Sequence, residues 1–391
     1  MVKSKLPEKW DWLKLKDLVS INYGKGLGER QRLGGNIAVY GSNGVVGQHN
    51  TALTLGQTII VGRKGSAGAI NYSEQACWPI DTTYFIDQFP NFLNPRYLYH
   101  FLRSQPLSSL QQSAAIPGLN RDVLYSVEIP IPFPKEPARS LETQRRIVLR
   151  LETLLGEVKS ARELQESIEE DTGQLLDAFL GETFSEKSNW DVFPISRFAE
   201  VKGGKRLPKG EKFAEGTTEF PYLRVVDFKD FSIEKESLKY LTPEIQQTIR
   251  RYTISKEDVY ISIAGTIGLV GTIPPELDGS NLTENAAKIV FRPEYKEKID
   301  PLFIAYYLAS PSGKEQIRKY TMAAGQPKLA LIRIQTIEVP LPDITIQKSI
   351  VNRISTIREE ISEMQHAQRE NAELLDQTEQ SLLAQAFRGE L

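Results

Sequence analysis

Two segments of the chain carry apolar residues at spacings that alternate between four and three. This spacing is typical of a heptad seam, in which the apolar stripe of one helix packs against a partner helix. The segments fall within residues 140–185 and 343–391. Because both occur in one chain, we expect two long helices that pair with each other. The apolar members of the predicted seams are Ile147, Leu151, Leu154, Val158, Ile168 and Leu175 in the first, and Ile350, Ile354, Ile357, Ile361, Met364, Leu375 and Leu382 in the second.

Residues that flank the seams indicate where each helix begins and ends. Pro134 and Pro137 precede the first seam, and Ser140 is a candidate N-cap, since its hydroxyl can accept from a free backbone N–H. Gly181 and Gly389 follow the last seam residues, and glycine suits the left-handed conformation that often ends a helix. These signals predict that the two helices lie within 140–185 and 343–391.

The other residues, 1–139 and 186–342, show short apolar runs rich in Ile, Val and Tyr. Gly, Asn and Pro separate the runs, which is typical of short strands. Residues 95–112 and 301–320 are typical of amphipathic helices that open with proline. We therefore expect an α+β fold with two mixed α/β domains and two long helices. The strand candidates include residues 36–40, 58–61, 222–226 and 259–263.

The two halves of the chain form an internal repeat. Landmarks of the first half recur in the second half in the same order, which chance matching explains poorly. Between the landmarks the halves differ strongly, and a duplication that served only stability would not explain this divergence. The matched landmarks are Trp10 with Trp190, Gly24 with Gly204, Gly65 with Gly265, Gly68 with Gly268, Pro95 with Pro301, Pro130 with Pro340, and Gln144 with Gln347.

Composition narrows the class of protein. With 391 residues, 40% hydrophobic and 25% charged, the chain has room for two or three ordinary globular domains. One cysteine excludes an internal disulfide framework and fits a reducing cytoplasm, where we expect the protein to reside. Three histidines and one cysteine cannot supply an ordinary zinc site. Residues 1–7 hold no apolar core of signal-peptide length, and no apolar run is long enough to span a bilayer.

The net charge of −2 argues at first against a nucleic-acid partner. The distribution of the charge changes this picture. Residues 1–140 carry a net +5 and residues 190–342 a net +2, whereas 141–189 and 343–391 carry −5 and −4. Salt screens charges beyond about 10 Å, so the local field matters most to a polyanion. Long helices are often acidic in any case, and the charge split alone decides little.

Sequence motifs of catalysis are absent. The chain has no P-loop, no Gly-x-Ser-x-Gly elbow, no His-Glu-x-x-His and no Asn/Asp-Pro-Pro-aromatic signature of adenine methyltransferases. A nuclease-like set could be drawn from Asp278, Glu294 and Lys296, but Asp278 lies in a predicted turn. We therefore expect that the chain has no catalytic residue and binds neither a metal ion nor a cofactor.

Candidate binding residues lie in loops. Arg63 and Lys64 follow a buried-type strand in a glycine-rich turn, where they could meet phosphate or guanine. The matching turn of the second half lacks Lys and Arg, and basic residues precede it instead. The alternative for each loop is an ordinary turn with solvated side chains. The DNA-binding candidates are Lys25, Ser42, Asn43, Arg63, Lys64, Ser66, Thr82 and Thr83 in the first half, and Lys202, Lys205, Arg206, Thr266, Asn281, Thr283 and Asn285 in the second.

These motifs together resemble the specificity subunits of type I restriction–modification systems. In the first half the resemblance rests on residues 40–44, 59–66 and 78–83, and in the second on 258–268 and 281–287. Each half then gives a Pro-rich run, a Gln-x-x-Ile-Val helix start and an Ala-Phe-x-Gly-Glu close. The combination is specific and covers nearly the whole chain.

The resemblance implies a function and a set of partners. Each mixed domain would be a target recognition domain that reads one half of an interrupted site in double-stranded DNA. The two helices would pair as an antiparallel coiled coil between the domains. Two modification subunits, which carry S-adenosylmethionine and methylate adenine, would dock on the chain, and restriction or motor subunits would join them. The chain itself would be no enzyme, and no membrane would be involved.

Two other classes of protein remain possible from the residues alone. One is a self-contained restriction enzyme or methyltransferase with its own recognition domains, which an assay of the isolated chain for cleavage and methyl transfer would detect. The other is an adaptor whose repeat binds only protein. An adaptor would select no DNA sequence in the assembled complex.

Overall fold

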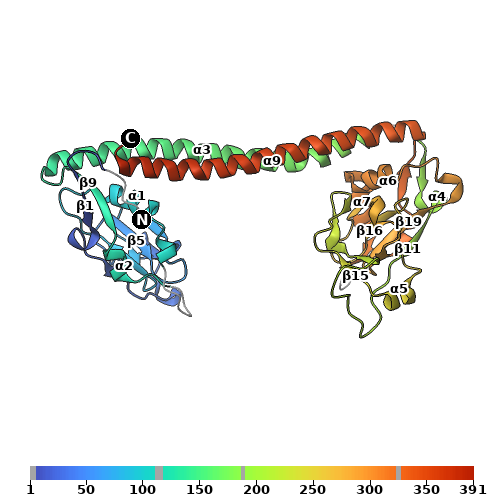
Figure 1. The fold of residues 1–391 in the computed structure, drawn as a ribbon, viewed down its shortest axis with the longest axis horizontal. Helices are drawn as coiled ribbons and strands as arrows, with labels where there is room; N and C mark the ends of the chain where they lie inside the picture. The colour runs from blue at the N-terminus through green and yellow to red at the C-terminus, as the bar shows by residue number, and fades with distance from the viewer. Residues whose placement is uncertain (1–5, 111–117, 186–189, 323–326) are drawn as a thin grey trace. The chain divides into compact units, whose positions relative to one another are not determined.

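The structure is a computed structural model that describes residues 6–110, 118–185, 190–322 and 327–391. The chain divides into two compact units. Unit 1 comprises Met1–Glu166 and Arg369–Leu391, and unit 2 comprises Ser167–Gln368. Each unit therefore combines one mixed domain with parts of both long helices (Figure 1).

A four-stranded antiparallel sheet with the order β2-β8-β5-β6 forms the centre of unit 1. Strand β5 is buried along its whole length because it lies inside the sheet and its central residues, Ile59 to Val61, are apolar. A second sheet has the order β4-β3-β7, and β1 pairs with β9. The elements of unit 1 are β1 (Trp10–Lys14), β2 (Asn22–Tyr23), β3 (Ile37–Gly41), β4 (Gly44–His49), β5 (Thr58–Gly62), β6 (Ile70–Ser73), β7 (Trp78–Pro79), β8 (Thr83–Ile86), α1 (Pro95–Ser104), α2 (Arg121–Tyr125), β9 (Glu128–Pro132) and the first part of α3 (Pro137–Thr183).

Unit 2 is built on the same plan. Its central sheet has the order β11-β19-β16-β17, and β12 pairs with β15 and β18 in a second sheet. The elements of unit 2 are β10 (Val192–Pro194), α4 (Ile195–Phe198), β11 (Ala199–Gly203), β12 (Pro221–Leu223), β13 (Phe228–Lys229), β14 (Ser232–Ile233), β15 (Lys239–Tyr240), α5 (Pro243–Ile249), β16 (Val259–Ser262), β17 (Val270–Thr272), β18 (Asn281–Leu282), β19 (Ala286–Phe291), α6 (Pro301–Ala309), α7 (Pro311–Tyr320), β20 (Thr321–Met322), β21 (Lys328–Leu329), α8 (Leu331–Gln335), β22 (Glu338–Pro340) and part of α9 (Ile344–Arg388).

The two central sheets confirm the internal repeat. Both have an edge strand, two inner strands and a second edge strand in corresponding order. Each unit also has one parallel strand pair, β3 with β7 in unit 1 and β12 with β18 in unit 2. The second strand of each pair is followed in the chain by a strand of the central sheet, β8 or β19. The predicted strand at 222–226 is shorter than expected, because residues Val225–Asp227 form a single 3-10 turn after β12. The α+β class is confirmed.

A second proline interrupts each of the two predicted helices that open with proline. Helix α1 ends at Ser104, two residues before Pro106. In unit 2, Pro311 divides the segment into α6 and α7, and Ser310 ends one helix and caps the next. Helix α6 is also not amphipathic, since every residue from Phe303 to Ala309 is buried. Residues 111 and 112 of the first prediction lie outside the described residues.

The long helices were predicted well except at their ends. Helix α3 begins at Pro137, and Ser140 lies inside it, where its Oγ accepts a hydrogen bond from Gln144 Nε2 at 2.9 Å. Gly181 also lies inside α3, since Thr183 is the last helical residue. Gly389 follows the last residue of α9 with φ of 75°, as expected of a C-terminal glycine.

Within unit 1 the two long helices run antiparallel. Arg162 of α3 donates to Glu379 at 2.7 Å and to Asp376 at 2.8 Å. Nearer the start of α3, Leu151 shares the core of the unit with Leu383. As α3 advances, its partners on α9 therefore lie earlier in the sequence. Helix α1 lies between this helix pair and the sheet, since Phe387 of α9 packs on its aromatic rings (Figure 1).

Within unit 2 the same helices meet through a polar pair. Gln368 donates to Thr172 Oγ1 at 2.9 Å, and both side chains are buried. Further along α3, Leu180 lies in one core with Ile354 of α9 and Phe303 of α6. A polar pair inside a helix seam costs stability and can fix the register of the two helices.

The seam prediction is wrong for three residues. Ile168, Leu175 and Met364 have 42%, 43% and 43% of their surface exposed and do not fill the seam. From Thr172 onward, the more buried residues of α3 instead recur every four positions. A straight α-helix has 3.6 residues per turn, so a strict repeat of 3.5 drifts around its surface. Of the other predicted seam residues, Ile147, Leu151, Val158 and Ile354 are buried, and Leu154, Ile350, Ile357, Ile361, Leu375 and Leu382 are half-buried.

Candidate nucleic-acid interface

Three turns of unit 1 meet at one end of its central sheet. The turn after β5 is tight, because Gly68 N donates back to Gly62 O at 2.8 Å. Gly65 and Gly68 adopt φ of 73° and 87°, a region that favours glycine. Arg63 and Lys64 both donate their backbone N–H to Thr82 O, at 2.9 and 3.1 Å. The turn after β5 is thereby joined to the turn between β7 and β8.

Ser42 and Thr83 hold these turns together. The Ser42 hydroxyl lies 2.7 Å from both Lys64 O and Thr82 O. Thr83 is fully buried, and its hydroxyl donates to Ile80 O at 2.7 Å. Both residues were predicted as DNA contacts. The structure instead gives them an internal role, because their hydroxyls are already used by backbone carbonyls.

The other predicted DNA-binding residues of unit 1, apart from Arg63, have side chains that reach solvent at this end of the sheet. The side chains of Lys25, Asn43, Lys64 and Ser66 are exposed, and that of Thr82 is half-buried. The backbone of Lys25 is held in place, since its N–H donates to Pro79 O at 3.0 Å and its carbonyl accepts from Trp78 Nε1 at 2.8 Å. Whether these side chains contact DNA stays a prediction.

Arg63 is half-buried because it packs on aromatic rings. Its guanidinium carbon lies 5.0 Å from the centre of the Tyr23 ring and 5.9 Å from that of Tyr84. A second guanidinium, that of Arg121, lies 4.9 Å from the same Tyr23 ring. Sequence reasoning missed Tyr23 and Arg121. No motif marks them, because they lie far apart along the chain and only folding brings them together.

The corresponding turns of unit 2 repeat the backbone arrangement. Gly265 and Gly268 have φ of 75° and 90°, and Gly268 N donates to Ser262 O at 3.1 Å. Lys205 N donates to Leu282 O at 2.8 Å, and the Lys205 carbonyl accepts from Tyr222 Oη at 2.9 Å. The scaffold of the predicted site is therefore the same in both units.

Two predicted residues of unit 2 are buried and have internal partners. Asn281 Nδ2 donates to Ile249 O at 2.9 Å. Thr283 Oγ1 donates to Glu284 Oε2 at 3.1 Å. Asn281 and Thr283 were predicted as DNA contacts, but the structure gives them internal roles, because both side chains are buried and already hydrogen-bonded. The other predicted residues, Lys202, Lys205, Arg206, Thr266 and Asn285, are exposed.

Glu284 changes the electrostatics of this end of unit 2. Its carboxylate lies 3.4 Å from Arg206 Nε and borders two surface hollows. Burial is the main reason that the pKa of Tyr222, which lines one hollow, is raised to about 12. The exposed side chain of Val226 adds an apolar contact to the same hollow.

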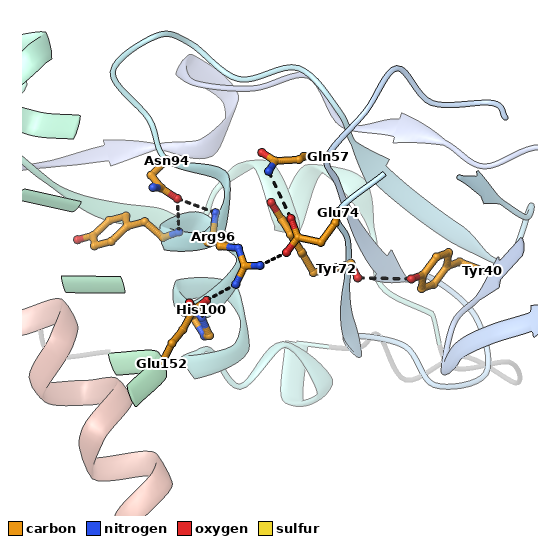
Figure 2. A network of polar contacts seen from close by, with 9 residues as sticks. Tyr40, Gln57, Tyr72, Glu74, Asn94, Arg96, His100 and Glu152 are labelled. Atoms are coloured by element: carbon orange, nitrogen blue, oxygen red, sulfur yellow. Dashed lines mark hydrogen bonds and ion pairs between the residues drawn. The ribbon is translucent and has the colours of Figure 1, made fainter. Parts of the chain in front are cut away.

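A polar network joins the sheet of unit 1 to α3 (Figure 2). Arg96 of α1 bonds to Glu74 beside β6 and donates to Glu152 of α3 at 2.7 Å. His100 Nε2 lies 3.0 Å from the same Glu152 oxygen. Burial lowers the pKa of His100 despite the Glu152 carboxylate. The network fixes the domain of unit 1 on its own part of α3.

The Glu152 carboxylate stays ionised in this network. Burial acts to raise its pKa, but hydrogen bonds from His100 and Arg96 outweigh this effect and lower the pKa. The neutral His100 ring donates to Glu152 from Nε2. Its other nitrogen, Nδ1, is buried without a partner among the described residues.

Asp278 lies in a turn, as expected, and accepts a hydrogen bond from Lys256 N at 2.9 Å. Within the described part of the chain, no three His, Cys, Asp or Glu residues are grouped so that they could hold a metal ion. None of the helices described combines the length and the apolar character that a membrane crossing requires.

Comparisons with known proteins agree with this picture. The model of a family described as "Type I restriction modification DNA specificity domain" matches residues 7–170 and 187–374. The specificity subunit of the type I restriction enzyme EcoBI of Escherichia coli is 23% identical, over 86% of this chain and 74% of its own length.

Solved structures share the fold over the whole chain. A chain from a structure concerned with complex assembly and conformational transition of a type I R-M system has a TM-score of 0.78 at 19% identity, and the match covers 100% of both chains. The HsdS subunit from Thermoanaerobacter tengcongensis has a TM-score of 0.60 at 20% identity, over 100% of this chain and 99% of its own length.

Proposed function

The chain belongs to the family of type I restriction–modification DNA specificity proteins and is a specificity subunit, and we propose that each unit reads one half of a bipartite target in double-stranded DNA. One observation carries this proposal. The same scaffold of turns occurs twice, and each copy presents a different set of exposed polar and charged side chains. Such a design suits two half-sites of different sequence, since base edges are read by side chains on a fixed backbone.

The chemistry of restriction and modification would come from partner subunits. We propose that two modification subunits, which hold S-adenosylmethionine, and restriction or motor subunits assemble on this chain, and that the chain itself is not catalytic. The long helices offer surface for this assembly. Leu149, Leu164 and Leu374 have 70%, 63% and 57% of their surface exposed and would add apolar contact area to such an assembly.

Mapping of methylated adenines tests this function. Cells that carry the modification subunits should show one interrupted methylated motif when this chain is present and none when it is absent. The purified chain alone should neither cut DNA nor transfer a methyl group from S-adenosylmethionine. Methyl transfer or cleavage by the chain alone would favour the self-contained enzyme. A complex that contains this chain but selects no sequence would favour the protein-only adaptor.

A further inference from the structure

Tyr23, Arg63 and Arg121 form a cluster in unit 1, of which the sequence motifs indicated only Arg63. The two guanidinium carbons lie 5.0 and 4.9 Å from the centre of one ring. Two cations against one ring repel each other, so the arrangement costs energy unless an anion or another acceptor lies nearby. The Tyr23 ring is itself 49% exposed. The cluster therefore opens to solvent at the end of the sheet where the turns meet.

Arg121 is held in place by its backbone neighbours. Leu119 N donates to Arg63 O at 3.0 Å, and Tyr84 Oη donates to Leu119 O at 3.0 Å. These bonds join the approach to α2 to the turn after β5. The Arg121 side chain then packs on Tyr23 and Tyr125. Its guanidinium is therefore oriented before any ligand arrives.

The donors of Arg121 are not used within the described part of the protein. Its Nε is buried without a hydrogen-bond partner, and no carboxylate forms an ion pair with it among the described residues. Arg63 differs, since its Nη1 donates to Asp81 O at 3.1 Å. A buried donor without a partner is costly, at about 1–3 kcal/mol, so its presence calls for an explanation. Of the two arginines, Arg121 is thus the one prepared to bind.

Unit 2 shows that the scaffold does not require this cluster. In the repeat, Tyr23, Arg63 and Arg121 correspond to Gly203, Ile263 and Leu331, as the shared strand order and turns indicate. These three residues line an open hollow, in which Leu331 lies 3.5 Å from the position that a Gly203 Cβ would occupy. At these three positions one unit therefore has two cations and an aromatic ring, whereas the other has a glycine and two apolar side chains. A difference of this kind at equivalent places is expected of residues that read different bases.

We propose that Arg121, oriented by Tyr23, reads a guanine in the half-site of unit 1. This inference rests on the proposed function. The guanidinium fork can donate two hydrogen bonds to O6 and N7 of guanine in the major groove, a pattern that the other bases do not offer. Exposed Lys64 and Lys25 are flexible cations that suit phosphate, whose recognition needs charge and little geometry. An arginine with a fixed orientation suits the directional contact.

Substitution of Arg121 in the assembled methyltransferase complex tests the assignment. Arg121→Leu introduces the residue of unit 2, and Arg121→Lys keeps the charge but loses the fork. Both variants should relax one guanine position of the unit 1 half-site by about 5- to 150-fold and leave the other half-site unchanged. Tyr23→Leu should relax the same position, since it removes the ring that orients Arg121. Lys64→Ala is the matched control and should weaken all sequences equally.

The outcomes separate the possible roles of Arg121. Equal weakening of every sequence by Arg121→Leu, with recovery in Arg121→Lys and a salt slope reduced by about 1, would assign Arg121 to phosphate and overturn the proposal. An unchanged motif in both variants would overturn it as well. If Arg121→Leu does not assemble, Arg121→Lys alone decides. If the unaltered complex selects no interrupted motif, the proposed function itself fails.

Discussion

Each unit has one junction where its mixed domain packs on a long helix. The two junctions share their hydrogen bonds to the backbone but differ in their contacts between side chains. In unit 1, buried Gln144 of α3 accepts from Asn94 N and donates to Phe92 O, both at 2.8 Å. In unit 2, buried Gln347 of α9 accepts from Asp300 N and donates to Lys298 O, both at 3.0 Å. Each glutamine thus bonds to one N–H and one carbonyl of the backbone just before a helix that packs on the sheet, α1 in unit 1 and α6 in unit 2.

Two turns further along each helix the pair of residues differs. His100 lies beside Glu152 in unit 1, and Tyr306 lies 3.2 Å from Ser355 in unit 2. Arg96 adds its charge to the first pair, and Arg358 donates to the Tyr306 hydroxyl at 3.1 Å in the second. Bonds from these helices to the backbone of the domain are therefore retained between the units, whereas contacts between side chains differ. The candidate DNA-binding turns show the same difference, since their backbone arrangement is shared and their exposed side chains differ.

The largest effect is expected from loss of the shared glutamines. Gln144→Leu leaves the half-buried Asn94 N–H and Phe92 carbonyl without this partner, and we expect a loss of about 2–5 kcal/mol in unit 1. Gln347→Leu should cause the same loss in unit 2. Hydrogen–deuterium exchange in denaturant, followed separately in peptides of each unit, measures both. Gln174→Leu, at an exposed position of α3, is the control. Equal protection in the variant and the control would refute the role of the glutamines.

A smaller but equally shared effect is expected at Gly24 and Gly204. A Cβ on these residues would lie 2.0 Å from Ile80 O and 2.1 Å from Thr283 O, and a backbone oxygen cannot move away easily. Alanine at either position should therefore destabilise its unit by about 1–3 kcal/mol or more. Gly26→Ala is the control, since its nearest neighbour would lie at 3.8 Å. The urea concentration at the midpoint of unfolding measures both substitutions. If Gly24→Ala lowers this midpoint no more than Gly26→Ala does, the predicted clash with the backbone is contradicted.

The smallest effect should be confined to unit 1 and depend on pH. The lowered pKa of His100 means that the unfolded chain takes up this proton first as the pH falls below about 6.5. Stability from this group is thus present above that pH and is lost below it, by at most about 1.4 kcal/mol for each pH unit. Burial is the main cause of the lowered His100 pKa. The charges of Arg96 and Arg103 lower this pKa further, and ionised Glu152 acts to raise it.

Exchange protection of unit 1, compared at about pH 7 and about pH 5.5, measures this loss. His100→Gln should remove it, because glutamine does not titrate, and unit 2 with Tyr306 serves as the internal reference. An equal loss of protection between the two pH values in the wild type and in His100→Gln would contradict the prediction.

Much of the architecture could be predicted from the sequence because it rests on local patterns. The repeat, the α+β class and the two long helices follow from periodicity and matched landmarks such as Gln144 and Gln347. Helix ends were less predictable, since Ser140 and Gly181 have the composition of caps but lie inside α3.

The candidate site was predictable only in part. The turns around Arg63 and Thr266 were found through their glycines, but burial depends on contacts between distant segments. Ser42, Thr83, Asn281 and Thr283 therefore looked like binding residues and are structural ones. The contact of Arg121 with Tyr23 is likewise a product of tertiary structure, so no local pattern could indicate it.

Exchange of one domain tests the central claim most directly. Residues 190–342 would be replaced with the matching domain of a relative that has a different target, and methylated adenines would be mapped in cells that carry the modification subunits. If each unit reads its own half-site, one half of the motif changes to that of the relative and the other half is retained. A motif that changes in both halves, or in neither, would contradict the account.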